Sequence, residues 1–161
     1  ITATSVTTNT SGIIDLDTSS GGIIATSVVS ADTASITAAA GDITLGSVTA
    51  VNAVDITSTA GSINDAIADA TADVVGSAVT LTAATGIGSG EALEFVDGAS
   101  VNASVTGTGN INLQGLGALT LGNTNTAAGS ITVGAAGLLT ATSVTTNTSG
   151  IIDLDTSSGG I

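Results

Sequence analysis

The two ends of this sequence are copies of one another. Residues 2–23 and 140–161 both read TATSVTTNTSGIIDLDTSSGGI, so that Thr2 recurs as Thr140. Folding does not demand identity at surface Ser and Thr positions, so a tandem duplication in the gene is the natural cause. We therefore interpret the sequence as slightly more than one 138-residue unit of an array, and we expect the array to continue on both sides. Proteins of this kind bury apolar surface between neighbouring repeats.

A shorter period lies inside the long one. Gly, an optional small polar residue and then Ile open a strand-like run eight times. The runs are GIIDL at 12–16, GIIAT at 22–26, GDITL at 41–45, GSIND at 61–65, GIGSG at 86–90, GNINL at 109–113, GSITV at 129–133 and GIIDL at 150–154. Most intervals between runs are about 20 residues long, and the first is a half-step. This length suits one coil of a parallel β-solenoid, which needs two or three short strands and their turns.

Apolar and polar residues alternate within these runs as they do in strands. Ile43–Leu45, Val79–Leu81 and Ile131–Val133 each carry a Thr between two apolar residues, which places the apolar pair on one face. We expect one isoleucine per coil to stack in an internal ladder made of Ile13, Ile43, Ile63, Ile87, Ile111, Ile131 and Ile151. With strands about 4.8 Å apart, seven such coils would rise about 33 Å. The predicted fold is all-β, a single continuous parallel β-solenoid over residues 1–161 with coils of about 20 residues.

Two segments interrupt the rhythm, and the first is acidic. Residues 63–78 read INDAIADATADVVGSA, with Asp65, Asp69 and Asp73 four residues apart. A helix would align the three carboxylates in one stripe of mildly repulsive i,i+4 pairs. The alternative is a looped-out coil with outward carboxylates, and the spacing does not decide between the two.

The second interruption, residues 88–100, reads GSGEALEFVDGAS and contains the single aromatic residue of the chain, Phe95. We expect a helical turn over residues 92–95 that packs Leu93 or Phe95 against the solenoid. The Asp97-Gly98 pair predicts a turn back into a strand.

Composition restricts the partners of the chain. Thirteen acidic residues and no Lys, Arg, His or Cys give a net charge of −13. Nucleic acid and anionic lipid are poor partners, because nothing in the chain can neutralise a phosphate. No uninterrupted apolar run approaches the roughly 18–20 residues that a spanning helix needs, so we expect no membrane insertion.

The same composition argues against catalysis. A nucleophilic triad needs a base of suitable pKa, and this chain has no His, Lys or Cys. Glu91, Glu94 and Asp97 are the one acidic cluster that invites comparison with glycoside chemistry, since paired carboxylates can hydrolyse sugars. Aromatic platforms and cationic groups to hold a sugar are missing, and solvated carboxylates on a protruding turn are the preferred interpretation. We predict that the chain is not an enzyme.

Calcium is the cofactor that the sequence permits. Hard cations take carboxylate and carbonyl oxygens as ligands. The candidate ligands are Asp15, Asp17, their copies Asp153 and Asp155, and Asp65, Asp69 and Asp73. Asp15 and Asp17 would share the outer face of a strand, and neither an EF-hand loop nor a calcium-roll repeat is present. Diffuse binding of divalent counterions is the alternative to defined sites.

Thr-x-Thr pairs at 2–4, 8–10 and 124–126 suggest an ice-binding surface as a further hypothesis. Ice binding on a solenoid would require the same pair on successive coils, and these pairs are scattered. Surface threonines of ordinary strands are the preferred interpretation.

The motifs also resemble those of a known group. The serial openings GDITL, GNINL and GSITV, and the stretch from SINDAIADATADVVGSAVTLTAATGIGSGEALEFVDGASVNAS to GNINLQGLGALTLG, are similar to filamentous-haemagglutinin-like exoproteins, giant repetitive bacterial surface proteins often exported by two-partner secretion. The resemblance covers roughly residues 36–137. It implies a right-handed β-helical shaft, an extracellular or cell-surface location, and roles in adhesion, biofilm or fibre formation, with no catalytic residues to carry over. The lack of basic residues and the near-exact long repeat depart from the family and favour a structural polymer.

The predicted function is therefore that of a structural extracellular fibre, sheath or matrix filament that self-associates through further repeats or copies. The alternative is the stalk of a large surface adhesin that presents a distant binding tip. A non-repetitive terminal domain in the parent protein would distinguish the adhesin from the fibre.

Overall fold

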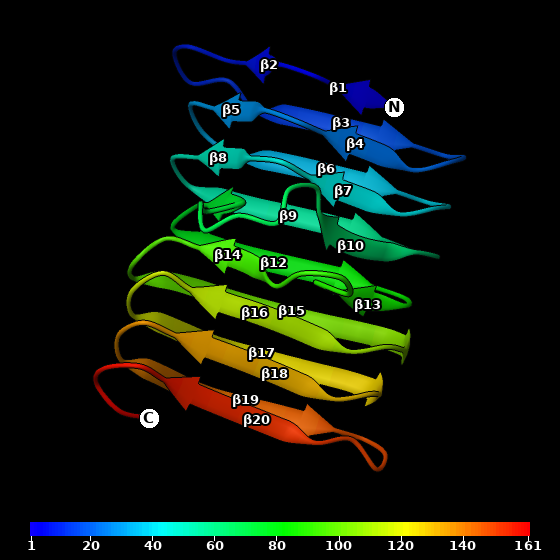
Figure 1. Ribbon diagram of the computed structural model, residues 1–161. Coiled ribbons are helices and arrows are strands. Elements are labelled where there is room, and N and C mark those ends of the chain that lie inside the picture. The colour runs from blue at the N-terminus through cyan, green and yellow to red at the C-terminus, as the bar shows by residue number, and fades with distance from the viewer.

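The computed structural model describes residues 1–161 and contains strands and turns but no helix. The chain winds into about eight stacked coils with its termini at opposite ends of the stack (Figure 1). Every strand pair is parallel, and the pairs form a thirteen-stranded sheet, named sheet A, and a seven-stranded sheet, named sheet B. The predicted all-β, parallel β-solenoid with coils of about 20 residues is thus confirmed.

The strands of sheet A are β1 (Thr2–Ala3), β2 (Val6–Thr7), β4 (Ile23–Ala25), β5 (Val28–Ser30), β7 (Ile43–Leu45), β8 (Val48–Ala50), β10 (Ser62–Asp65), β11 (Val74–Val75), β13 (Gly86–Ile87), β14 (Leu93–Phe95), β16 (Ile111–Gly115), β18 (Ile131–Ala135) and β20 (Ile152–Thr156). Those of sheet B are β3 (Ile14–Thr18), β6 (Ala34–Ala38), β9 (Ala53–Ser58), β12 (Ala78–Ala83), β15 (Ala99–Thr108), β17 (Leu119–Ala128) and β19 (Leu139–Thr146).

The cross-section of the solenoid changes along the stack. An early coil supplies two short strands to sheet A and one to sheet B, as β4, β5 and β6 do. A late coil supplies one longer strand to each sheet, as β16 and β17 do. The change occurs at β16, which pairs with both β13 and β14 of the preceding coil. Each later coil therefore consists of two longer strands, one in sheet A and one in sheet B, joined by turns.

An isoleucine ladder forms the centre of sheet A's inner face. Successive register partners are Ile23, Ile43, Ile63, Ile87, Ile111 and Ile131, and none is more than 1% exposed. Stacking one β-branched side chain on its own kind fills a narrow interior without large aromatic groups. Five of the seven predicted ladder positions are confirmed by these pairs.

The prediction is wrong for Ile13 and Ile151, which are 64% and 70% exposed. In both GIIDLD copies an Asp follows the second Ile and another follows the Leu. Turning both carboxylates outward requires the second Ile, Ile14 or Ile152, to face inward, because a shift of one residue exchanges the faces of a strand. Ile152 pairs with Ile131 and continues the ladder in the last coil, where it is 43% exposed, whereas Ile14 is buried and pairs with Ala34 in sheet B.

The two acidic segments form insertions in successive coils. The first insertion, residues 66–73, stands where the preceding coil has two residues between β7 and β8. The second insertion, residues 88–92, separates β13 from β14. Both leave the otherwise regular stack near its middle (Figure 1). The looped-out alternative is therefore the one observed, and no helix is present.

The helical turn expected at residues 92–95 is wrong, because Leu93–Phe95 is strand β14. Leu93 and Phe95 nevertheless pack inside as expected, both at 0% exposure. Phe95 has Gly115 as its register partner in the next coil. The predicted turn at Asp97-Gly98 is confirmed, with Gly98 at a φ of 79°.

The two identical segments occupy different sheets. In the first copy, residues 2–7 lie in sheet A and Ile14–Thr18 lies in sheet B. In the second copy, residues 140–146 lie in sheet B and Ile152–Thr156 lies in sheet A. Six register steps lead from Ile23 to Ile152, and Ile14, the copy of Ile152, lies half a coil before Ile23. One 138-residue unit thus spans about six and a half coils, not seven.

The ladder supplies a test of the fold. We expect Ile111→Ala to lower the free energy of unfolding by about 2–5 kcal/mol, because the cavity would lie between Ile87 and Ile131. The control Ile24→Ala removes the same atoms from a side chain that is 48% exposed, and should stay within about 0.5 kcal/mol of the parent. Urea unfolding followed by circular dichroism measures both. Equal losses in the two variants would contradict the inward assignment.

Candidate functional site

Three carboxylates meet where the two insertions leave the stack. Asp65 ends β10, Asp73 is the last residue of the first insertion, and Glu94 is the middle residue of β14. One carboxylate oxygen from each lies within 4.8 Å of the other two. We call Asp65, Asp73 and Glu94 the carboxylate triad.

Backbone pairing holds two members of the triad side by side. The Asp73 N–H donates to the Glu94 carbonyl oxygen at 3.0 Å, and the Val48 N–H donates to the Asp73 carbonyl oxygen at 2.7 Å. The Glu94 N–H donates to Asp73 Oδ2 at 2.9 Å. Asp73 is therefore fixed between the coil that precedes it and the coil that follows it.

The third member of the triad, Asp65, occupies a strand position that holds an apolar residue in the preceding coil. Asp65 is the register partner of Leu45, which is fully buried. The first insertion begins directly after Asp65, so the strand ends where its carboxylate replaces an aliphatic side chain. Asp65 thus immediately precedes the insertion, and Asp73 is its last residue.

Two of the three side chains, Asp73 and Glu94, are buried, and Asp65 is half-buried. Leu93 and Phe95 face the core, so strand alternation directs Glu94 between them to the outer side. Glu94 is nevertheless only 8% exposed and Asp73 only 3%. A side chain on the outer side of a coil is buried only when another segment covers it, and the insertions are the segments that leave the coil here.

The buried oxygens lack partners. Asp65 Oδ2 and Glu94 Oε2 are both buried and accept no hydrogen bond. The chain has no Lys, Arg or His, and its only cationic group, the Ile1 amine, donates to the Gly22 carbonyl oxygen at 2.8 Å. No group of the chain therefore compensates the charge of the triad.

The electrostatics follow from this burial. Burial raises the pKa of Asp73 to about 8; the Glu94 N–H acts in the opposite direction, whereas the Glu94 carboxyl and Asp65 add to the increase. Burial also raises the pKa of Glu94, where a hydrogen bond from Asp73 opposes the increase and the charges of Asp65 and Asp69 support it. Three ionised carboxylates at this distance require either bound protons or a cation.

Asp69 stays outside the triad. It is exposed, and its Oδ1 accepts both the backbone N–H and the hydroxyl of Thr71, which lower the pKa of the carboxyl. The expectation of outward carboxylates in this segment thus describes Asp69, whereas the Asp73 side chain is buried.

The other predicted ligands are dispersed. Asp15 and Asp17 are exposed on sheet B, and their copies Asp153 and Asp155 are exposed on sheet A. None of the four belongs to a group of three potential ligands.

The carboxylates first compared with a sugar-cleaving cluster also separate. Glu94 belongs to the triad, and Glu91 lies exposed in the second insertion. Asp97 Oδ1 accepts the Ala118 N–H at 2.6 Å, which ties the turn to the next coil.

Glu94 was not among the predicted ligands, yet the sequence contained a signal for it. Asp73 and Glu94 are separated along the chain by the length of one coil. Parallel coils bring residues one coil apart into register, so this spacing pairs the two carboxylates.

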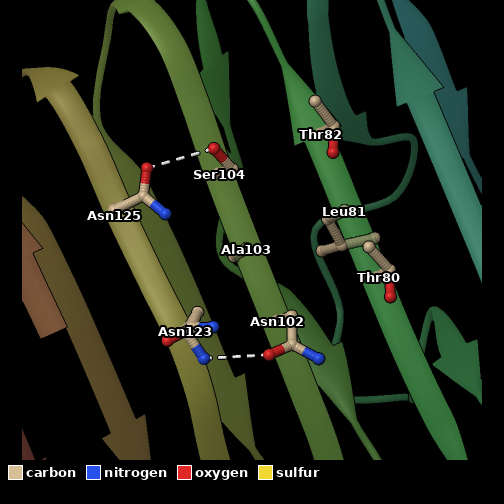
Figure 2. A pocket seen from close by; sticks show the side chains of 8 residues that line it. All are labelled: Thr80, Leu81, Thr82, Asn102, Ala103, Ser104, Asn123 and Asn125. Atoms are coloured by element: carbon tan, nitrogen blue, oxygen red, sulfur yellow. Dashed lines mark hydrogen bonds between the residues drawn. The ribbon is translucent and has the colours of Figure 1, made fainter. Parts of the chain in front are cut away.

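A second polar feature lies on the outer face of sheet B. It is a shallow depression of about 180 Å³. Figure 2 shows the residues that line it: Thr80, Leu81, Thr82, Asn102, Ala103, Ser104, Asn123 and Asn125. The register between β15 and β17 shifts here after Val101. Asn102 Oδ1 accepts the Asn123 N–H at 2.8 Å, and Ser104 Oγ donates to Asn125 Oδ1 at 3.1 Å (Figure 2). The depression is thus the outer side of a β-bulge, where the side-chain amide of Asn102 accepts a backbone N–H of the next coil.

No protein-family model, curated protein or solved structure matches this chain. None of its elements is a helix with the length and apolarity to cross a membrane. The resemblance to filamentous-haemagglutinin-like exoproteins stays a prediction from the sequence.

The triad predicts an inverted pH dependence in a buffer with EDTA. Asp73 has a pKa of about 8 in the folded chain against an ordinary value of 3.8, so the folded state holds a proton that the unfolded state releases. This contribution to stability is complete below pH 4 and is lost as the pH rises towards 8, by up to about 1.4 kcal/mol per pH unit. The facing groups, Asp65, Asp69 and Glu94, are all acidic and support the same direction.

Urea unfolding at several pH values between 4 and 8 measures this slope. Asp73→Asn should flatten it, whereas Asp17→Asn, a change on the exposed face of sheet B, should leave it unchanged. The same slope in Asp73→Asn as in the parent chain would contradict the assignment.

Proposed function

We propose that this chain is a segment of a structural extracellular fibre built from tandem β-solenoid units. The observation that carries the proposal is the pairing of the two identical segments. The first copy pairs with the coil that follows it, through β1, β2 and β3. The second copy pairs with the coil that precedes it, through β19 and β20. One sequence therefore accepts partners on both of its edges, as a joint between consecutive units must.

The inward residues at the joint support the same proposal. Ala3 and Ile14 face the interior in the first copy as register partners of Ala25 and Ala34. Their counterparts Ala141 and Ile152 are register partners of Leu121 and Ile131. The same alternation thus fits either sheet, and a further unit could extend the ladder without a break.

A location outside the cell agrees with the composition. Thirteen carboxylates and no Lys, Arg or His leave the shaft with strong self-repulsion, which salt at physiological strength screens beyond about 8 Å. Charges on outward strand positions such as Asp15 and Asp17 remain in contact with that salt. The resemblance found in the sequence points to the same location.

The fibre proposal predicts a length for each unit. Chains of two, three and four tandem 138-residue units should form rods that lengthen by about 31 Å per unit, since six and a half coils rise about 4.8 Å each. Electron imaging of the purified rods measures the increment. Rods that widen instead of lengthening, or compact particles, would contradict the proposal.

The half-coil offset predicts a second spacing. Each unit would place its joint on the sheet opposite to the previous one, so the strict axial repeat would be two units, or about 62 Å. Power spectra of native filaments should show a layer line near 4.8 Å and others that index on about 62 Å. Indexing on about 33 Å alone would mean seven whole coils per unit and would contradict the offset. Short cell-tethered rods with distinct tips would identify an adhesin stalk instead of a fibre.

A further inference from the structure

We propose that Asp65, Asp73 and Glu94 bind one Ca²⁺ ion, which fastens the first insertion to the neighbouring coil. The three side chains come from separate segments: the end of β10, the end of the insertion and the middle of β14. Each offers a carboxylate oxygen, and the three oxygens lie within 4.8 Å of one another. A cation between them would contact all three segments at once.

The burial of Glu94 indicates a missing ligand. The side chain is 8% exposed, and its Oε2 is buried without a hydrogen-bond partner beside Asp65 and Asp73. Asp65 Oδ2 is buried and unpartnered in the same place. Buried charged oxygens normally pair with a cationic group or coordinate a metal. With no Lys, Arg or His in the sequence, the partner must come from solution.

The donor set selects the ion. Every side-chain donor is a carboxylate oxygen, and the chain contains no His or Cys, so zinc and softer transition metals lack their preferred ligands. Mg²⁺ commonly keeps several waters and takes one or two protein carboxylates, whereas Ca²⁺ accepts more oxygens in a flexible arrangement. Three carboxylates with oxygens within 4.8 Å of one another therefore favour Ca²⁺.

The position of the triad gives the ion a structural role. Asp65 immediately precedes the first insertion and Asp73 ends it, so one ion would close the loop at its base. Glu94 belongs to the next coil and would join that closed loop to the stack. Asp69, which pairs with Thr71 at the exposed part of the insertion, takes no part.

The test is calorimetric titration of CaCl₂ into the EDTA-treated and dialysed 161-residue chain in 0.15 M NaCl. We expect one site, and a rise in the thermal midpoint with added Ca²⁺. Glu94→Gln should weaken binding by at least about tenfold, because loss of even an outer-shell partner of a metal costs about 10- to 100-fold. The matched control Asp69→Asn should bind as the parent chain does.

Folding of the variants is checked by circular dichroism. Glu94→Gln keeps the shape of the side chain and removes an uncompensated charge, so the metal-free variant should fold at least as stably as the parent. Asp73→Asn provides a second variant with the same expectation.

Three results would overturn the proposal. The first is undiminished binding in Glu94→Gln and Asp73→Asn. The second is a series of equal weak sites that disappears in 0.5 M NaCl, which would indicate diffuse counterions. The third is displacement of Ca²⁺ by an equal concentration of Mg²⁺. Because the triad lies within one unit, none of these measurements depends on fibre formation.

Discussion

The in-register ladder between successive coils is the constraint on which the rest of the structure depends. Backbone hydrogen bonds join residues about one coil apart even outside the strands, as from the Asn52 N–H to the Asp32 carbonyl oxygen at 2.9 Å. Each coil therefore imposes its register on the next, and like side chains stack on like. A core of Ile, Val, Leu and Ala with the single Phe95 suffices for this geometry, because every coil closes its interior against its neighbours and needs no large aromatic cluster.

Much of this ladder could be predicted from the sequence because its period is written there as Gly and Ile recurring once per coil. Ile43, Ile63 and Ile87 follow directly from that spacing. The same rule failed at Ile13 and Ile151, where two adjacent isoleucines compete and the following aspartates decide which one faces inward. The half-step between the first two runs was visible as well. Its meaning, a strand placed on the opposite sheet, required the register of the folded coils.

The candidate site was only partly predictable. The four-residue spacing along the chain suggested one group of Asp65, Asp69 and Asp73. In the structure Asp65 and Asp73 lie together, and the third carboxylate beside them is that of Glu94, not Asp69. The one-coil separation of Asp73 and Glu94 can be read from the sequence and would have predicted that these two carboxylates lie side by side. Burial could not be read from the sequence, because it depends on the path of the two insertions, and irregular loops carry no periodic signal.

The distribution of charge distinguishes this site from every other acidic position in the strands. Asp15 faces Ser35, Asp17 faces Thr37, and Asp153 faces Thr132, so a neutral side chain separates the carboxylates along the stack. Like charges directly opposite one another destabilise neighbouring strands. A chain that is wholly acidic must therefore space its charges, and this one does so except where Asp73 meets Glu94. That departure coincides with the two insertions and with two unpartnered buried oxygens. The stack tolerates these facing carboxylates only with bound protons or a bound cation. For this reason we place the proposed cation site of the solenoid at the one point where its regular stacking is interrupted.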